Sequence, residues 1–344
     1  MSQRITVILA ATSGGGTVTA VRGLLHLWHK SGHAITLIRT PDSAGLLREE
    51  QSLGVDVVEI PRRATRATLG SAVALIRDAS RLRHDLIRIR RAVRDRPDAV
   101  VLPFLTGTAL VTLAATIGLP NRVIVCERND TSVQPFGWHV RLLRRLLYPR
   151  AAAITVNSSN PAASDLLRRI SRGRPVHVVP NPHPRDTRPA DPVNSRVILG
   201  EGPLRSDLEA QIDRLGLTHR ITLTGQIDDP RSYYASAGLF VLPSDYEGTS
   251  NVLLEAASAG LPCILNAEIA PPGSAGTFLT APLDSPAGLA DVILQACTDE
   301  PMRQVYGDAA RRWVSSPTET EILSAWGIAL SLDLQPPSDD AARR

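Results

Sequence analysis

Short apolar runs alternate along the chain with longer stretches in which apolar residues recur every three or four positions. The short runs predict buried β-strands, and the longer stretches predict helices that pack against them. In the first half, the runs lie at 5–10, 34–39, 55–60, 99–104, 122–126, 154–157 and 176–180. This rhythm is typical of a parallel sheet with helices on both faces.

A second series of the same kind follows a proline-rich segment at 180–194. We interpret this segment as a linker, because prolines and polar residues dominate it. The later runs read "RVILG", "RITLTG", "LFVLPS" and "PCILN". The chain is therefore expected to form two doubly wound α/β domains, with ligands bound in a cleft beyond the carboxyl ends of their strands.

An uncharged stretch at 99–119 is long enough to span a bilayer. Pro103 and Gly107 divide it into a strand-length piece and a helix-length piece, so we predict a buried strand, loop and helix instead. The first residues carry no pattern typical of a secretory signal.

Composition narrows the class of protein. The 344 residues are 43% hydrophobic and 21% charged, which fits a globular protein with two cores. The net charge of +4 comes from arginine, since Lys30 is the only lysine. Three widely spaced cysteines predict neither a disulfide framework nor a metal cluster, and they favour a reducing cytoplasm. Aromatic residues make up only 4%, and no nucleic-acid-binding module is recognisable, so nucleic acid is not an expected partner.

Three consecutive glycines, Gly14, Gly15 and Gly16, follow the first predicted strand and precede a predicted helix at 18–31. Glycines let the backbone approach a ligand closely, and the start of a helix favours an anion. The same run is equally typical of a flexible turn without a ligand.

The stretch "SDYEGTSNVLLEAASAGLP" carries two carboxylates, Glu247 and Glu255. Thr249, Ser250 and Asn251 precede an apolar helix and are suited to cap it or to leave N–H groups for a phosphate. Glu255 lies inside this helix, where a buried carboxylate needs hydroxyl groups or a cation as partners. Paired sugar hydroxyls would serve; a solvent-facing Glu255 and a simple loop charge at Glu247 remain the alternative.

The longer stretch "LFVLPSDYEGTSNVLLEAASAGLPCI" resembles the donor-binding signature of family 4 glycosyltransferases, which are retaining enzymes of the GT-B fold. The resemblance extends to "GGGTVTAVRGLLHLWHKSGHAITLI" near the start, to "VHVVPNP", to "GEGPLRSDLEAQIDRLGLTHRITLTGQIDD" and to "YYASAGLFVLPS". It implies two Rossmann-like domains that face a cleft: an N-terminal, acceptor-side domain and a C-terminal, nucleotide-sugar domain. The expected boundaries are 1–180 for the first domain, 181–194 for the linker, 195–316 for the second domain, 317–334 for a helix that returns to the first domain, and 335–344 for a flexible tail.

The resemblance also implies roles for single residues. Glu255 would bind the ribose hydroxyls of a nucleotide-diphosphate sugar, and Glu247 would bind the transferred sugar. The implied donor-binding set is completed by the glycines of the first loop and by the loop and helix around the second acid: Gly14, Gly15, Gly16, Gly248, Thr249, Ser250, Asn251 and Leu253. Enzymes of this kind generally need no metal and no resident cofactor.

The chain departs from the family pattern between "VVPNP" and "GEGPLR". Members of the family carry a strand, a phosphate-binding loop and a helix there, so we predict a deletion of one βα unit and a truncated second domain. Gly200, Gly202 and Arg205 are candidates to face the phosphates instead. Three other interpretations stay open. Arg205 is an exposed helix residue without a ligand; a partner chain covers the gap that the missing strand leaves in the sheet; or the protein is a weakly active relative of the family.

On the acceptor side, Glu127, Arg128 and Asn129 directly follow a predicted strand. They resemble the "ERN" loop of a subset of family 4 enzymes, so we expect them at the cleft. Arg128 is equally suited to meet a phosphate or to form a structural salt bridge.

Two stretches mix arginine with an apolar helical stripe, at 81–96 and 138–150. Such a pattern suits an anionic membrane surface that carries a lipid-linked acceptor. For the first stretch we favour a helix that covers the sheet; for the second, both interpretations stay open.

Together these observations predict a bacterial glycosyltransferase of envelope or exopolysaccharide synthesis, located in the cytoplasm or peripherally at the inner face of the membrane. It would move a sugar with retention from a nucleotide-diphosphate sugar to a glycan or lipid-linked acceptor. The alternative is a non-catalytic GT-B-like protein that has lost part of its diphosphate site.

Overall fold

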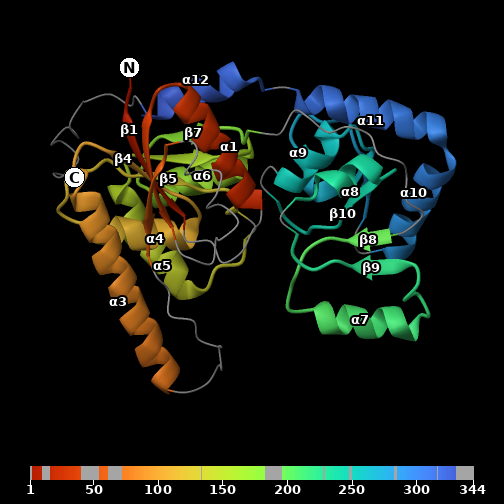
Figure 1. Cartoon of the computed structure of the whole chain (residues 1–344), viewed down its shortest axis with the longest axis horizontal. Helices are drawn as coiled ribbons and strands as arrows, with labels where there is room; N and C mark the ends of the chain where they lie inside the picture. The colour runs from red at the N-terminus through yellow and green to blue at the C-terminus, as the bar shows by residue number, and fades with distance from the viewer. Residues whose placement is uncertain are drawn as a thin grey trace.

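The computed structural model describes residues 2–9, 16–39, 54–60, 72–132, 134–182, 196–227, 229–247, 250–282, 285–315 and 317–330, without the side chains of 72–81. Figure 1 shows two α/β bodies side by side, with the chain passing from the first to the second and back to the first. Most of the predicted linker at 181–194 and all of the predicted tail at 335–344 lie outside the described residues.

The N-terminal domain is built on parallel strands in the order β3-β2-β1-β4 and β5-β6-β7. Two isolated parallel bridges, Val101 with Val123 and Phe104 with Cys126, join β4 to β5 and make the two sheets continuous. The strands are β1 (Arg4–Leu9), β2 (Ala34–Arg39), β3 (Asp56–Glu59), β4 (Val100–Pro103), β5 (Ile124–Cys126), β6 (Ala153–Val156) and β7 (Val176–Val178). They fall on the apolar runs of the sequence and confirm the predicted parallel α/β architecture.

Helices cover both faces of this sheet, because successive side chains of a strand point to opposite sides. On β1, Ile5, Val7 and Leu9 enter one core, whereas Ile8 enters the other. The first core is closed by α1 (Gly16–Lys30) and α12 (Glu319–Leu330). The second core contains residues of α3 (Ala72–Arg94), α4 (Thr106–Ala115) and α6 (Pro161–Ile170).

The last described helix, α12, packs on the N-terminal domain although it follows the C-terminal domain in sequence (Figure 1). Trp326 on α12 meets Trp28 on α1 edge-to-face, with ring centroids 5.0 Å apart. Both rings are buried. The first core is therefore assembled from both ends of the described chain.

The uncharged stretch at 99–119 forms β4, a short turn and α4, as the proline and the glycine within it predict. Leu105, between the two elements, has a φ of 72°, which is unusual for a residue with a side chain. Within the described ranges, no helix combines the length and the apolarity needed to cross a bilayer.

The C-terminal domain has a parallel sheet in the order β10-β11-β12. One face packs on α9 and α11, which meet so closely that a Cβ atom on Gly307 of α11 would run into the carbonyl oxygen of Gly260. The other face packs on α10. The elements are α8 (Arg231–Ser236), β10 (Phe240–Leu242), α9 (Asn251–Ser258), β11 (Cys263–Asn266), β12 (Leu279–Ala281), α10 (Pro286–Thr298) and α11 (Glu300–Val314).

A separate βα unit precedes this sheet in sequence: β8 (Arg196–Ile198), α7 (Arg205–Arg214) and β9 (Ile221–Leu223). β8 and β9 pair in parallel as a sheet of their own, and no residue from 196 to 224 is buried. The predicted deletion would remove the strand that lies between β8 and β10 in the sheet. Without this central strand, a single sheet would be divided into two, as observed. The deletion itself stays a prediction, because residues 183–195 lie outside the described part of the chain.

Candidate functional site

A cleft of about 450 Å³ lies between the two domains. Asn129 lines it from the loop after β5, and the segment from Pro243 to Glu247 lines it from the loop after β10. Both loops follow the carboxyl ends of parallel strands, where α/β proteins bind their ligands. The structure thus brings one acceptor-side candidate and one of the two acids to the same cleft.

Glu247 is held in this cleft by hydroxyl groups. The Ser244 hydroxyl donates to Oε1 of Glu247 at 3.1 Å, and Ser250 also forms a hydrogen bond with this carboxylate. Partial burial disfavours the charged form and raises the pKa of Glu247, although the two hydroxyl groups oppose this shift. The amide of Asn266, at the end of β11, donates to the carbonyl oxygen of Ser244 at 3.3 Å and so helps to fix the loop.

Glu255 is buried on α9, beside the N-terminal domain. The Tyr234 hydroxyl donates to Oε2 of Glu255 at 3.0 Å, and Thr19 of α1 forms a further side-chain hydrogen bond. Desolvation raises the pKa of Glu255, with a smaller contribution from the nearby charge of Asp229. Glu255 is therefore a buried carboxylate at the boundary of the domains, held by two hydroxyl donors.

Helix α1 forms the N-terminal side of this boundary and contacts α9. Pro182, in the connection between the domains, packs so tightly on α1 that a Cβ atom on Gly23 would lie 2.6 Å from its Cγ. Gly23 thus allows the connection to cross the helix. The glycine run of the sequence leads into the same helix, since Gly16 is its first residue.

Arg128 does not line the cleft; it is buried under the domain connection. Its Nη1 donates to the carbonyl oxygen of Val179 at 3.1 Å and to Oδ1 of Asn181 at 3.2 Å. The Asn181 amide in turn donates to Oδ1 of Asn251, the first residue of α9, at 3.0 Å. A chain of hydrogen bonds therefore runs from the N-terminal domain to the start of the helix that carries Glu255.

The guanidinium of Arg128 also lies over two aromatic rings. Its carbon is 5.1 Å from the ring centre of Phe104 and 5.5 Å from that of Trp326. Burial lowers the pKa of Arg128. These rings and acceptors place Arg128 among the residues that join the domains, rather than in an ion pair with a carboxylate.

Glu127 is fully buried next to Arg128. The Thr106 hydroxyl lies 2.8 and 3.0 Å from its two oxygens, and the Tyr148 hydroxyl donates to Oε1. Arg144 adds an ion pair at 3.8 Å. Of the three acceptor-side candidates, Asn129 is therefore the one that the structure places on the cleft.

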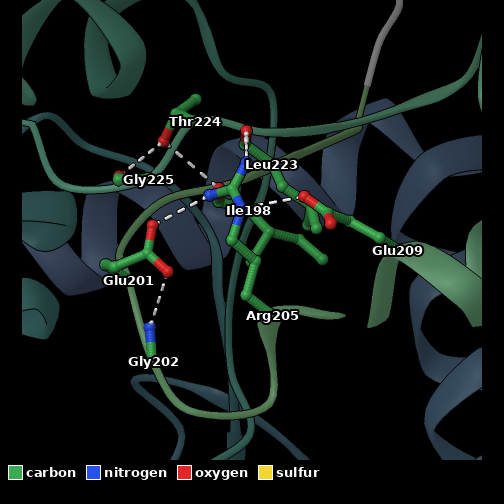
Figure 2. A network of polar contacts seen from close by, with 8 residues as sticks. All are labelled: Ile198, Glu201, Gly202, Arg205, Glu209, Leu223, Thr224 and Gly225. Carbon is green, nitrogen blue, oxygen red and sulfur yellow. Dashed lines mark hydrogen bonds and ion pairs between the residues drawn. The ribbon is translucent and has the colours of Figure 1, made fainter. Parts of the chain in front are cut away.

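Arg205 lies at the start of α7, in a network of polar contacts (Figure 2). Its Nη1 pairs with Glu201 at 2.9 Å, its Nε pairs with Glu209 at 2.8 Å, and its Nη2 donates to the carbonyl oxygen of Leu223 at 3.3 Å. A side chain on Gly225, whose φ is 71°, would meet this network. The structure thus places all three nitrogens of Arg205 on protein acceptors.

The remaining donor-side candidates lie on α9 or just before it. Ser250 is at the N-cap position but makes no capping bond with its side chain, Asn251 begins the helix, and Leu253 is buried in the core of the domain. Gly14, Gly15, Gly248 and Thr249 lie outside the described residues. Among the described residues, no group of three or more His, Cys, Asp or Glu side chains is arranged to hold a metal ion.

Three residues of the site had no role in the sequence-based prediction: Thr19, Asn181 and Tyr234. Each lies within a stretch that carries the family resemblance. The sequence does not show which residues far apart in the chain pair with one another. Thr19 contacts Glu255, and Asn181 contacts Asn251, only in the folded arrangement of the two domains.

A second, smaller hollow of about 230 Å³ lies in the N-terminal domain, where β1, β2 and β4 end. Its lining is largely apolar and comes from both the sheet and the helices that cover it. The lining residues are Ile8, Leu9, Ile38, Arg39, Ile60, Asp85, Ile89, Leu105, Gly107, Thr108 and Val111.

Two family models match the chain. Residues 15–182 match the model described as "Glycosyl transferase 4-like domain", and residues 187–299 match the model described as "Glycosyl transferases group 1". Together the two matches span most of both domains. The chain therefore belongs to the family 4 glycosyltransferases of the GT-B fold.

Individual relatives act on lipid-linked sugars. The GalNAc-alpha-(1->4)-GalNAc-alpha-(1->3)-diNAcBac-PP-undecaprenol alpha-1,4-N-acetyl-D-galactosaminyltransferase of Campylobacter jejuni is 24% identical over 290 residues, which are 73% of this chain and 76% of that enzyme. The UDP-Gal:alpha-D-GlcNAc-diphosphoundecaprenol alpha-1,3-galactosyltransferase of Escherichia coli is 39% identical over 71 residues. These residues are 20% of this chain and 18% of that enzyme.

Solved structures show the same fold at low identity. HepE of Anabaena, in complex with UDP and glucose, superposes with a TM-score of 0.74 at 14% identity, over 96% of this chain and 100% of that one. Sucrose-phosphate synthase of Thermosynechococcus elongatus gives a TM-score of 0.74 at 17% identity, over 96% and 99% of the two chains. The protein thus shares the GT-B fold of these solved structures.

Proposed function

We propose that the protein transfers a sugar, with retention, from a nucleotide-diphosphate sugar to a glycan or lipid-linked acceptor in bacterial envelope or exopolysaccharide synthesis. The observation that carries this proposal is the position of the two acids. Glu247 lines the interdomain cleft opposite Asn129, and Glu255 is a buried carboxylate between α9 and α1. The names of the relatives from Campylobacter jejuni and Escherichia coli support the lipid-linked class of acceptor.

Glu255 is suited to the ribose of the donor. A buried carboxylate is costly unless hydrogen bonds compensate for its lost hydration. Tyr234 and Thr19 supply two donors in the absence of ligand. Neighbouring ribose hydroxyls would add charge-assisted bonds to the remaining lone pairs, and these are stronger than bonds between neutral groups.

Glu247 is suited to the sugar that is transferred. Cleavage of the anomeric bond develops positive charge on this sugar and negative charge on the leaving diphosphate. Glu247 would orient sugar hydroxyls and stabilise the positive charge, while the free N–H groups at the start of α9 would face the diphosphate. The Ser250 side chain makes no capping hydrogen bond to those N–H groups.

For the leaving diphosphate we propose no metal ion, so that activity should persist in EDTA. Arg205 is a candidate ligand only if a phosphate displaces Glu201 or Glu209 from its guanidinium. The Arg205→Ala variant tests this point, since unchanged nucleotide affinity would remove Arg205 from the donor site.

Calorimetry against a panel of nucleotides and nucleotide sugars tests the proposed donor site. The parent protein should bind at least one member of the panel, and Glu255→Ala should lose that binding. Glu300→Ala, which removes an exposed carboxylate from α11, is the matched control and should bind like the parent. If the parent binds none of the compounds, the non-catalytic alternative becomes the better interpretation.

The stereochemical part of the proposal needs a separate measurement. Once a donor and an acceptor are known, the anomeric configuration of the first product formed can be read by NMR. A product with the configuration of the donor supports retention, and an inverted product rules it out.

A further inference from the structure

Helix α5 (Trp138–Leu147) has an unusual distribution of polar and apolar side chains. Its single buried residue is an arginine, Arg144. Val140 and Leu147, on the same side of the helix, are half-buried, and all other residues of α5 are exposed. A helix on the surface of a globular protein normally does the opposite and turns its apolar stripe inward.

A buried acid explains this orientation. Arg144 forms an ion pair with Glu127 at 3.8 Å, and its guanidinium lies 4.8 Å from the ring centre of Phe136 and 5.2 Å from that of Tyr148. Glu127 is itself held by Thr106 and Tyr148. Because a buried cation and a buried carboxylate are each costly without the other, this pair fixes the rotation of α5 about its axis.

With Arg144 inward, an apolar stripe points to solvent. Trp138, Leu142 and Leu146 are spaced four residues apart, which places them one above another on the opposite side of the helix. Their side chains are 77%, 48% and 59% exposed. Arg141 and Arg145 are exposed beside this stripe, and α5 contains no acidic residue. We call these five residues the α5 face.

The chemistry of the α5 face fits the surface of an anionic bilayer. Leucine side chains enter the boundary between head groups and acyl chains, and tryptophan is favoured at that depth. Arginines beside the stripe reach out to lipid phosphates while their stems stay in apolar surroundings. Helix α3 is also rich in arginine, but its exposed Leu82 and Ile87 are five residues apart and do not share a stripe.

We propose that the α5 face docks the protein onto an anionic bilayer and presents the cleft to an acceptor carried in that bilayer. This inference rests on the proposed function for its acceptor, and it adds the surface and the kind of partner. The cleft is close in sequence, since Asn129 lies in the loop that joins β5 to α5 and Trp138 is the first residue of α5. Docking through α5 thus brings the acceptor-side loop toward the lipid surface.

Trp138 reports directly on this docking. Of the four tryptophans, Trp28 and Trp326 are buried, Trp313 is half-buried, and Trp138 alone is exposed. Vesicles of phosphatidylcholine and phosphatidylglycerol should shift the tryptophan emission to shorter wavelength and protect it from iodide. Vesicles of phosphatidylcholine alone should have a much smaller effect, because each arginine near an anionic surface contributes roughly a fivefold gain in affinity.

Two variants of the full chain test the face by co-sedimentation with the same vesicles. Leu142→Ser combined with Leu146→Ser should reduce bound protein about tenfold or more, since the two serines no longer bury apolar area in the bilayer. Arg141→Gln combined with Arg145→Gln should remove the preference for phosphatidylglycerol. The matched controls are Leu294→Ser with Val305→Ser, exposed apolar residues of α10 and α11, and Arg88→Gln with Arg91→Gln on α3. Both controls should bind like the parent.

The outcomes separate the alternatives. Equal binding to both kinds of vesicle, or loss of binding in the α3 control instead of the α5 variants, overturns the proposal. Dimerisation in the absence of lipid that is abolished by Leu142→Ser and Leu146→Ser would assign the face to a second copy of the chain, and it overturns the proposal too. Nucleotide affinity measured without vesicles should be the same in all variants, so failure of membrane docking is distinguishable from failure of the proposed donor site.

Discussion

Glu255 shows how a single side chain links stability to binding. Its carboxylate is buried on α9, and desolvation raises its pKa above the ordinary value of 4.5. Burial in the folded protein favours the neutral form of the Glu255 carboxyl group. The hydroxyl donors Tyr234 and Thr19 favour its charged form, but their effect is smaller. The group contributes most to stability at low pH, and this contribution is lost as the pH rises through the raised pKa.

We expect Glu255→Gln to remove part of this pH dependence. At pH 8 the unliganded variant should melt at the same temperature as the parent or slightly higher, because no charge is left to bury. Nucleotide affinity should fall about 10- to 100-fold, since the amide cannot accept charge-assisted bonds from two hydroxyls. Melting curves between pH 4.5 and pH 8 and calorimetry at pH 8 provide the measurements.

Glu300→Gln serves as the control, because that side chain is exposed. A Glu255→Gln variant that is destabilised equally at pH 5 and pH 8 would contradict the expected linkage. It would show that Glu255 is needed for packing in either protonation state.

Asn181 is the central member of the chain of hydrogen bonds between the domains. It accepts from Arg128 and donates to Asn251. The Asn181→Asp variant separates these two contacts, since a carboxylate still accepts from Arg128 but cannot donate to Asn251. It also supplies the buried guanidinium with a negative partner.

We therefore expect Asn181→Asp to fold at least as well as the parent but to bind nucleotide sugar several-fold more weakly. A loss of one hydrogen bond corresponds to roughly a factor of 3 to 10. Thermal melting and calorimetry check the two parts. Unchanged affinity would mean that the bond to Asn251 has no influence on how α9 is positioned.

Among the helices, α12 contributes most clearly to a core that is not local in sequence. Trp326 packs edge-to-face on Trp28, and Ile322, Ala329 and Leu330 are buried in the same core. We expect Trp326→Ala to lower the free energy of unfolding by about 3 to 5 kcal/mol, as is usual when a buried tryptophan is truncated.

Urea unfolding gives this difference, with Trp138→Ala as the comparison. Trp138 is largely exposed on α5, so its truncation should change the free energy of unfolding by about 0.5 kcal/mol or less. Similar values for the two variants would argue against the docking of α12 on the N-terminal domain.

The unit β8-α7-β9 has the opposite character. None of its residues is buried, and Arg205 of α7 contacts Glu201 and Leu223 outside the helix (Figure 2). Exposed ion pairs of this kind contribute about 0 to 1 kcal/mol. We expect the backbone amides of 205–214 to exchange with deuterium faster than those of α9, which has a buried face. Slower exchange in α7 than in α9 would show that the unit is covered in solution.

The sequence predicts the alternation of strands and helices well, because each buried strand is a compact apolar run. β12 was not predicted: its core is only "LTA", and the stretch before it is rich in glycine and proline. The separation of the sheet β8-β9 from the sheet β10-β11-β12 could be anticipated only from the expected family pattern. The sequences of β8 and β10 do not by themselves indicate that a neighbouring strand is missing.

The candidate site could be predicted in part. The sequence singles out the stretch around Glu247 and Glu255 as the candidate for the chemistry, and this role stays a prediction. Asn129, which the rule for strand ends directs to the cleft, lines it. The position of Arg128 could not be read from the sequence, since its acceptors Val179 and Asn181 lie about fifty residues further along the chain. The inward orientation of Arg144 likewise depends on Glu127, which belongs to another element.

The two domains are connected twice by the chain, once before β8 and once between α11 and α12 (Figure 1). Contacts of α1 with α9 and the packing of Pro182 on Gly23 add to these connections. Glu247 and Glu255 therefore lie on one body and Asn129 on the other, and the bond from Asn181 to Asn251 is one of the contacts that join these bodies in the described part of the chain.

The ion pair between Lys30 and Glu319 joins residues 289 positions apart and marks where α12 closes the first core. During synthesis, Trp28 has no partner ring until the ribosome has translated Trp326. The N-terminal domain is thus synthesised first, but its core is completed last. A chain that stalls after α11 exposes the apolar surface that α12 would cover, and chaperones or proteases can bind there.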